Sequence, residues 1–297
     1  MCGRVRFHAL LQARRVGHDA GMARSFRRIL RASIIGTALS LSGIALVRAD
    51  APSSRATAAF DAYVHKVEAR LDQQHQSPSS FLAPEDRQRL RSGEVLIEKL
   101  VPADRRNLPG AMLHHWRGTA FAPGATAADF ERMMRNFTSY PQIYAPQVIR
   151  SAVSAHDDDR YAVIMRVRQK HVLTVVMDTA YDVQFGRLDP LHGWSASRST
   201  AIHEIADAGT PKEHALNEAD GHGFLWRLNT YWSYEERDGG LYLQVESVSL
   251  TRSIPTGLGW AVGPFVESVP RESLEFTLRK TREALKPGPA TPSGGSR

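Results

Sequence analysis

The sequence predicts an α+β domain in which a curved antiparallel β-sheet grips a long C-terminal helix. Between residues 109 and 251 the chain contains a series of segments with period-two alternation, separated by turn residues, which is typical of antiparallel strands. After the last of them, residues 268–286 carry apolar positions at helical spacing. A bent sheet wrapped around a terminal helix leaves a hollow between the two. The fold class therefore predicts a ligand-holding domain.

The domain is expected to open with a strand at residues 112–121 and a short helix. Thr126 and Asp129 have the spacing of a capping box, in which each side chain satisfies a backbone amide at the helix start. Pro141 is expected to end this helix. The helix carries apolar side chains at helical spacing, namely Phe130, Met133, Met134 and Phe137.

Further strands are expected at residues 148–155, 161–170, 172–184, 195–205, 224–236 and 241–251. Three aspartates at 157–159 and an Asp-Gly-Gly turn at 238–240 predict hairpins between neighbouring strands. Apolar residues occupy alternate positions in these strands, and basic residues often occupy the positions between them. This pattern predicts one solvated face and one covered face.

The closing helix is expected to begin near Ser268, with Pro270 in its first turn. Val269 and Phe276 fall on the side that would face away from the sheet. An N-terminal helical extension at residues 50–108 is expected to cover them, through an amphipathic helix within residues 50–76. The ligand-binding domain then spans residues 109–286, and residues 287–297, rich in Pro, Gly and Ser, are expected to form a disordered tail.

The positive charge of the chain is concentrated at its N-terminus. The formal net charge is +7, from 38 basic and 31 acidic residues. Residues 1–49 hold nine arginines and a single acidic residue, Asp19, so the remainder is close to neutral. Nucleic-acid binding needs a localised basic surface, and we therefore exclude nucleic acid as a partner of the folded domain.

The basic N-terminus has the pattern of an export signal. A basic segment follows Met22, residues 32–47 form an uncharged and mostly apolar run, and Val47-Arg48-Ala49 resembles a cleavage site. We expect cleavage after Ala49 and a periplasmic protein; the alternative is an uncleaved membrane anchor. Cys2 is the only cysteine and lies before this signal, so a mature chain would contain no disulfide and no cysteine metal ligand.

Three passages resemble the START-like, or SRPBCC, superfamily. They are residues 119–124 with the following helix, the Tyr-Pro to Ala-Pro exit at 140–146, and residues 249–264 leading into the final helix. The resemblance covers about residues 109–286 and implies a helix-grip fold. The superfamily includes polyketide cyclases and lipid-transfer domains but shares no single catalytic set. The helical extension at 50–108 departs from its usual pattern.

No catalytic or metal-binding motif stands out, and no cofactor is predicted. His114 and His115 are adjacent on a strand and should point to opposite faces, so they cannot chelate one metal together. Gly193-Trp-Ser-Ala-Ser197 is not a nucleophile elbow. Glu246 is compatible with either a surface pair with Arg252 or a buried polar contact.

The predicted function is the binding or transport of a hydrophobic small molecule or lipid, with transient membrane contact. The alternatives are a cyclase- or hydrolase-type enzyme acting in the same hollow, and an interaction module whose hollow is filled by Trp226 and Trp232. Methionine and aromatic side chains are adaptable pocket linings. The predicted ligand-binding residues are Met133, Met134, Tyr144, Val163, Met165, Val175, Met177, Trp226, Trp232, Phe265, Leu274 and Leu278.

Overall fold

The computed structural model describes residues 51–83, 86–101, 107–170, 174–217, 220–253 and 259–286, without the side chains of Asn107 and of residues 259–267. The expected export signal and the expected tail lie outside the described residues. Within the described part, no helix is both long enough and apolar enough to cross a membrane.

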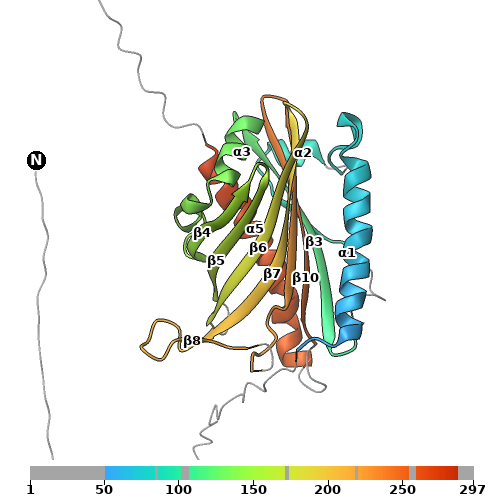
Figure 1. Ribbon diagram of the computed structural model, residues 1–297. Coiled ribbons are helices and arrows are strands. Elements are labelled where there is room, and N and C mark those ends of the chain that lie inside the picture. Colours follow the sequence, from blue (N-terminus) through green and yellow to red (C-terminus); the bar gives the residue numbers. More distant parts are fainter. Residues whose placement is uncertain are drawn as a thin grey trace, which may run out of the picture. The chain divides into compact units, whose positions relative to one another are not determined.

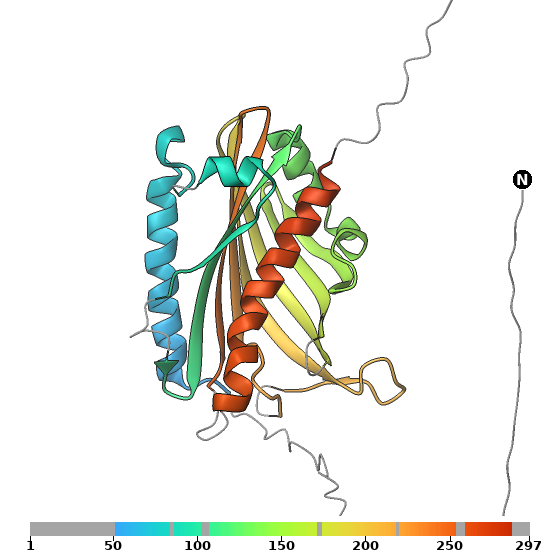
Figure 2. The same cartoon turned by 180° about the vertical axis from the view of Figure 1, so that it is seen from behind.

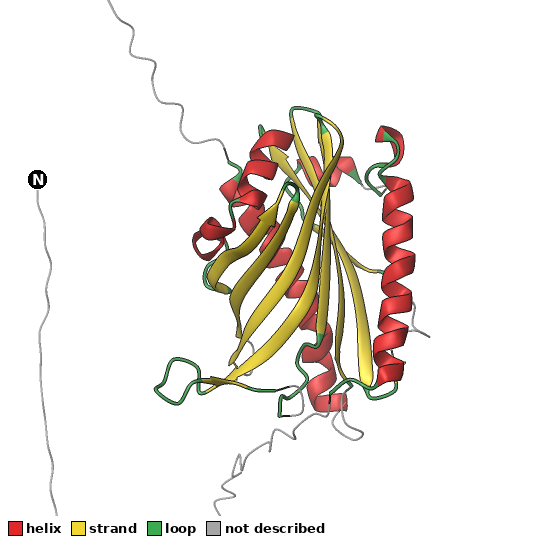
Figure 3. Cartoon of the chain, viewed as in Figure 1, coloured by secondary structure: helices red, strands yellow, loops and turns green. Residues whose placement is uncertain are grey.

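The described chain folds into one large antiparallel sheet with helices on both of its faces (Figure 1; Figure 3). The main strands follow the order β1-β3-β10-β9-β7-β6-β5-β4, with β2 beside β3 and β8 beside β7. The strands are β1 (Leu96–Lys99), β2 (Asn107–Leu108), β3 (Ala111–Pro123), β4 (Val148–Asp157), β5 (Arg160–Lys170), β6 (Thr174–Asp189), β7 (His192–Ala206), β8 (His214–Ala215), β9 (Arg227–Arg237) and β10 (Gly240–Arg252). The helices are α1 (Ser54–Gln74), α2 (Arg87–Arg91), α3 (Ala127–Arg135), α4 (Tyr140–Ile143) and α5 (Gly259–Ala284), with 3-10 turns at Pro78–Ser80 and Phe137–Ser139.

The predicted fold class is confirmed, and so are the capping box and the Asp-Gly turn. The prediction that Pro141 ends the first helix is wrong, because α3 ends at Arg135 and Pro141 lies in the first turn of α4, where a proline is tolerated. Thr126 Oγ1 accepts a hydrogen bond from the Asp129 amide at 3.1 Å, and Asp129 Oδ2 accepts one from the Thr126 amide at 3.3 Å. These two bonds complete the capping box of α3. At the β9–β10 hairpin, Asp238 and Gly239 have φ values of 57° and 74°. An Asp-Gly pair adopts this left-handed backbone easily, which explains the tight turn.

The long C-terminal helix α5 lies diagonally across the concave face of the sheet (Figure 2). It approaches β3 closely at Gly118, where a Cβ atom would lie 2.5 Å from Leu278 Cδ1 and 3.2 Å from Leu274 Cδ2. Glycine at this position therefore allows the helix to seat on the strand. Leu278 is fully buried there.

The start of α5 differs from the prediction. The helix begins at Gly259, so Ser268 lies inside it and does not cap it. Pro270 also lies within the helix. Proline is common in the first helical turn, and this preference places the predicted boundary too late in the sequence.

The N-terminal helix α1 packs on the convex face of the sheet, opposite to α5 (Figure 1; Figure 2). Its buried stripe, which includes Phe60 and Val64, forms one apolar cluster with strand residues such as Leu113 and Val248. The prediction that this helix covers Val269 and Phe276 is wrong. Phe276 packs against the apolar cluster on the concave face, the concave cluster, which includes Val163, Trp232 and Leu278. The prediction of a single covered face is also wrong for β3, β9 and β10, where α1 covers the second face.

A buried polar network lies between α1 and the sheet. The Tyr63 hydroxyl and His115 Nδ1 are 2.9 Å apart, and His115 Nε2 lies 2.8 Å from Glu246 Oε2. Arg70 donates to the same Glu246 oxygen at 2.5 Å. Burial alone would raise the pKa of Glu246, but the hydrogen bond from His115 and the nearby Arg70 guanidinium outweigh burial and hold this pKa below its ordinary value. Of the two interpretations of Glu246, the structure shows the buried polar contact.

His75, just past the end of α1, should make stability depend on pH. Its Nε2 lies 2.7 Å from Ser233 Oγ, and its ring stacks on Trp194. Burial, with a smaller contribution from Arg70, lowers the pKa of His75 from 6.5 to about 4. Between these values the unfolded chain binds a proton that the native chain does not. The contribution of His75 to the free energy of unfolding is therefore present above pH 6.5 and is lost as the pH falls toward 4.

Urea unfolding at pH 7 and pH 5 checks this prediction. The native protein should lose up to about 2 kcal/mol more of its unfolding free energy than the His75→Gln variant between these two pH values. An equal loss in both proteins would show that His75 titrates normally in the folded state.

Candidate ligand-binding face

The concave face divides into two parts, and the part beneath α3 and α4 is filled with aromatic side chains. Phe130 of α3 packs on Trp232 and Tyr234, with ring centroids 5.3 and 4.9 Å apart. Phe137 packs on Tyr140 at 5.2 Å. These rings belong to one buried cluster that leaves the concave face closed at this end.

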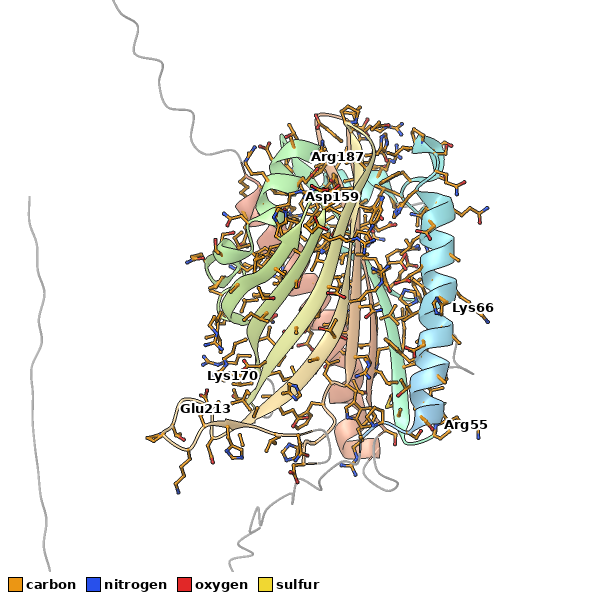
Figure 4. All side chains as sticks on the ribbon, in the orientation of Figure 1. Arg55, Lys66, Asp159, Lys170, Arg187 and Glu213 are labelled. Carbon is orange, nitrogen blue, oxygen red and sulfur yellow. The ribbon has the colours of Figure 1, made fainter. Side chains whose placement is uncertain are left out.

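A carboxylate closes the same end of the sheet. Glu131 of α3 is buried and accepts hydrogen bonds from Arg135 at 2.8 Å, Arg187 at 2.6 Å and the Tyr234 hydroxyl at 3.2 Å. Figure 4 shows Arg187 and Asp159 at this end, and Arg135 also binds Asp159 at 2.6 Å. Because two guanidinium groups engage Glu131, this carboxylate has a structural role.

Tyr144 connects this end to the gripped helix. Its hydroxyl lies 3.0 Å from Thr281 Oγ1 of α5, and both side chains are buried. Burial raises the pKa of Tyr144 to about 12, against a smaller lowering by the hydrogen bond with Thr281. The phenol is therefore neutral at physiological pH and anchors the last turns of α5.

The second part of the concave face carries a line of uncharged polar groups that we call the polar row: Trp116, Ser247, Thr230 and Ser197. Strand register aligns them, since Trp116 pairs with Ser247, Ser247 with Thr230, and Thr230 with Ser197. Each lies two positions along its strand from Gly118, Val245, Trp232 or Ser195. Gly118 faces α5, and Val245 and Trp232 belong to the concave cluster, so the polar row faces the same side.

The polar groups of the polar row have no hydrogen-bond partner among the described residues. Trp116 is 9% exposed, and its Nε1 has no hydrogen-bond partner among the described residues. The hydroxyls of Ser247, Thr230 and Ser197 are half-buried and have no protein partner within the described ranges either. A buried N–H that stays unpaired costs about 1–3 kcal/mol, which favours a partner from outside the described residues.

Apolar side chains on the concave face are also incompletely buried, with Leu228 two positions from Thr230 on β9, and Met165 and Val175 farther away on β5 and β6. Met165 and Leu228 pack against the concave cluster and remain half-buried, and so does Val175 farther along β6. In a closely packed core such side chains would be fully buried. Their partial exposure leaves apolar side-chain surface uncovered on this face.

The structure brings most of the predicted ligand-binding residues together. Eight belong to or pack against the concave cluster: Met133, Met134, Tyr144, Val163, Met165, Trp232, Leu274 and Leu278. Val175 and Met177 lie on β6 in the alternation of Tyr181 and Val183, which belong to that cluster. Phe265 lies in α5, but its side chain is outside the described part of the chain. Contact of these residues with a ligand stays a prediction.

Trp226 lies elsewhere. It belongs to the cluster beneath α1, together with Phe60 and Tyr231, whereas Trp232 belongs to the concave cluster. The prediction that Trp226 and Trp232 wall the same hollow is therefore wrong. Trp226 precedes the first residue of β9, Arg227, so the alternation of that strand does not extend to it.

Trp116, Ser247 and Ser197 are absent from the predicted ligand-binding residues. Small hydroxyl residues on a half-buried strand are normally taken as solvent-facing. Their shared register with Trp232 and Val245 would have placed them on the inner face. Strand pairing is a long-range property, and sequence alternation alone does not reveal it.

Two pockets formed by described residues lie away from the polar row. One, of about 620 Å³, is bordered by α2, β1 and Arg271 of α5. The other, of about 250 Å³, lies where β5, β6 and β7 run side by side, and Met165 and Thr179 line it together with Ile164 and His203. Among the described residues, no group of three or more His, Cys, Asp or Glu side chains is placed to hold a metal ion.

No family model matches the chain, and no curated protein sequence matches it. Among solved structures, it is similar to a STAR-related lipid transfer protein from Xanthomonas axonopodis (16% identity, TM-score 0.39, 64% of this chain and 98% of that one). It is also similar to a START superfamily protein from Mycobacterium smegmatis (14%, 0.39, 58% and 96%) and to the Zhui aromatase/cyclase from Streptomyces sp. R1128 (15%, 0.39, 58% and 93%). One of these solved structures is described as a START superfamily protein, the superfamily that the sequence resembles. At these identities and TM-scores the likenesses assign neither a ligand nor an activity to this chain.

Proposed function

We propose that this protein binds a hydrophobic small molecule or lipid on its concave face, between the polar row and α5. The observation that carries the proposal is the apolar surface left uncovered on this face, at Leu228 beside the polar row and at Met165 on β5, both of which face inward and are only half-buried. Burying such surface stabilises a complex by about 25 cal/mol per Å². The aromatic part beneath α3 supplies a rigid support and is itself closed.

Placing a large side chain on the polar row should block binding. Ser197→Trp places an indole at a half-buried position of the polar row. We expect it to weaken binding of the neutral fluorophore N-phenyl-1-naphthylamine by about tenfold or more, which corresponds to about 1.4 kcal/mol. A bound apolar molecule seen by native mass spectrometry of the native protein should be lost in the variant.

Thr200→Trp is the matched control. Thr200 lies on the same strand and is exposed, so an indole there should leave fluorophore binding unchanged. Circular dichroism verifies that both variants fold. Equal binding by Ser197→Trp and the native protein, or no binding of any apolar molecule by the native protein, would contradict the proposed function.

The expected export signal at residues 22–49 extends this proposal to a periplasmic carrier with transient membrane contact. N-terminal sequencing of the protein recovered from the cell envelope tests the location. A mature chain starting at Asp50 supports it, and a chain that retains residues 22–49 in the membrane fraction supports the anchored alternative.

A further inference from the structure

The polar row also indicates the chemistry of the ligand, and this inference rests on the proposed function. Four neighbouring strands, β3, β10, β9 and β7, each present one uncharged polar group to the concave face. Neighbouring strands are about 4.8 Å apart, so these groups extend over roughly 14 Å. A ligand without polar atoms would leave all four of these groups without a hydrogen-bond partner.

Trp116 is the group that restricts the ligand most. Its indole N–H is a donor only, so its partner must be an acceptor. The side chain is nine-tenths buried, and its Nε1 has no hydrogen-bond partner within the described residues. The neighbouring hydroxyls of Ser247, Thr230 and Ser197 can each donate or accept. Together they fit oxygen atoms placed along one edge of an otherwise apolar molecule.

The charge of the surroundings favours a neutral oxygen over a carboxylate or phosphate. The polar row itself contains no ionisable group. The nearest cation in register is Lys99, which pairs with Trp116 across β1 and β3. Its Nζ lies 5.5 Å from the centroid of the Trp116 ring. Because β1 flanks β3 on the side opposite to β10, this cation lies beyond the Trp116 end of the polar row, and β3 separates it from the strands that carry the hydroxyls. A buried anion next to hydroxyls alone would lose more hydration than it regains.

We propose that the polar row recognises uncharged oxygen atoms, carbonyl or hydroxyl, on an apolar ligand, and that the Trp116 N–H donates to one of them. Trp116 is then a specificity-determining residue. It should discriminate an oxygenated ligand from a hydrocarbon of the same length, because only the former satisfies the buried donor.

Displacement of N-phenyl-1-naphthylamine by tridecane, 2-tridecanone and tridecanoic acid tests this proposal. The native protein should bind the ketone about threefold to tenfold more tightly than the alkane, as expected for one additional hydrogen bond. The ionised acid should bind no more tightly than the alkane. Trp116→Phe should reduce the affinity for the ketone to that for the alkane and leave the alkane unchanged.

Trp226→Phe is the matched control. Because Trp226 lies in the cluster beneath α1, its replacement should not change the ratio of the affinities for the ketone and the alkane. A second measurement does not depend on the folding of a variant. In the native protein, the indole N–H resonance of Trp116 should move downfield with the ketone and stay in place with the alkane.

The possible failures are distinguishable. If the fluorophore and all three probes fail to bind, the proposed function itself is wrong. If the probes bind but the ketone and the alkane bind equally, or the acid binds most tightly, the concave face binds ligands without the proposed recognition. An unchanged Trp116 resonance on addition of a bound ketone also overturns the inference.

Discussion

Replacing Leu278 with alanine should destabilise the protein by about 2–5 kcal/mol, the largest effect that we expect from a single substitution in the grip. Leu278 is fully buried, and its Cδ1 lies in the space that a Cβ on Gly118 would occupy. Truncation removes apolar contacts and leaves a cavity that a rigid helix on a sheet cannot collapse to fill. Chemical denaturation measures the loss directly.

A double-mutant cycle makes this prediction more specific. Gly118→Ala alone should destabilise the protein by about 1–3 kcal/mol, because the new methyl group clashes with Leu278 and, less closely, with the flexible end of Ile97. Combined with Leu278→Ala, the same methyl group enters the vacated space, so the double variant should be more stable than the sum of the single effects implies. Additive effects would show that α5 does not seat on β3 as described.

Replacing Glu246 with alanine should cost about 3 kcal/mol. Glu246 is 2% exposed and joins His115 of β3 to Arg70 of α1. Its loss leaves the buried His115 ring without its carboxylate partner. The estimate stays at the lower end for a buried pair because Arg70 is 41% exposed and regains water when the pair is broken.

Glu246→Gln is the informative comparison. The amide keeps the size of the side chain and an oxygen acceptor but removes the charge, so it should destabilise the protein less than alanine does. Because the pKa of Glu246 is held low, its contribution is present at neutral pH and declines as acid protonates the carboxylate. The alanine variant should therefore lose less stability on acidification than the native protein. If both variants match the native protein at pH 7, the network does not hold α1.

The sequence predicted the elements that depend on local chemistry. The capping box at Thr126 and the Asp238-Gly239 turn each involve residues within a few positions of one another, and both were confirmed. Alternation in β5 and β6 also predicted the inner face correctly, since Val163 and Tyr181 are buried in the concave cluster.

The predictions that failed concern which helix covers which face of the sheet. β3 is buried on both faces, with His114 and His115 both buried, so its pattern does not distinguish the side of α1 from the side of α5. A polar residue such as Glu246 on the second covered face has the pattern of a solvated position. The polar row was likewise hidden, because its groups come together only through the pairing of strands distant in sequence.

Methyl NMR of methionine would detect an apolar molecule that binds on the concave face. Met165 on β5 is half-buried and faces inward, and Met177 lies farther along β6 with the same inward-facing alternation. Titration of the purified protein with 2-tridecanone should shift the methyl resonances of Met165 and Met177 in a saturable manner. If the ketone binds and both resonances stay in place, the ligand does not bind on the concave face.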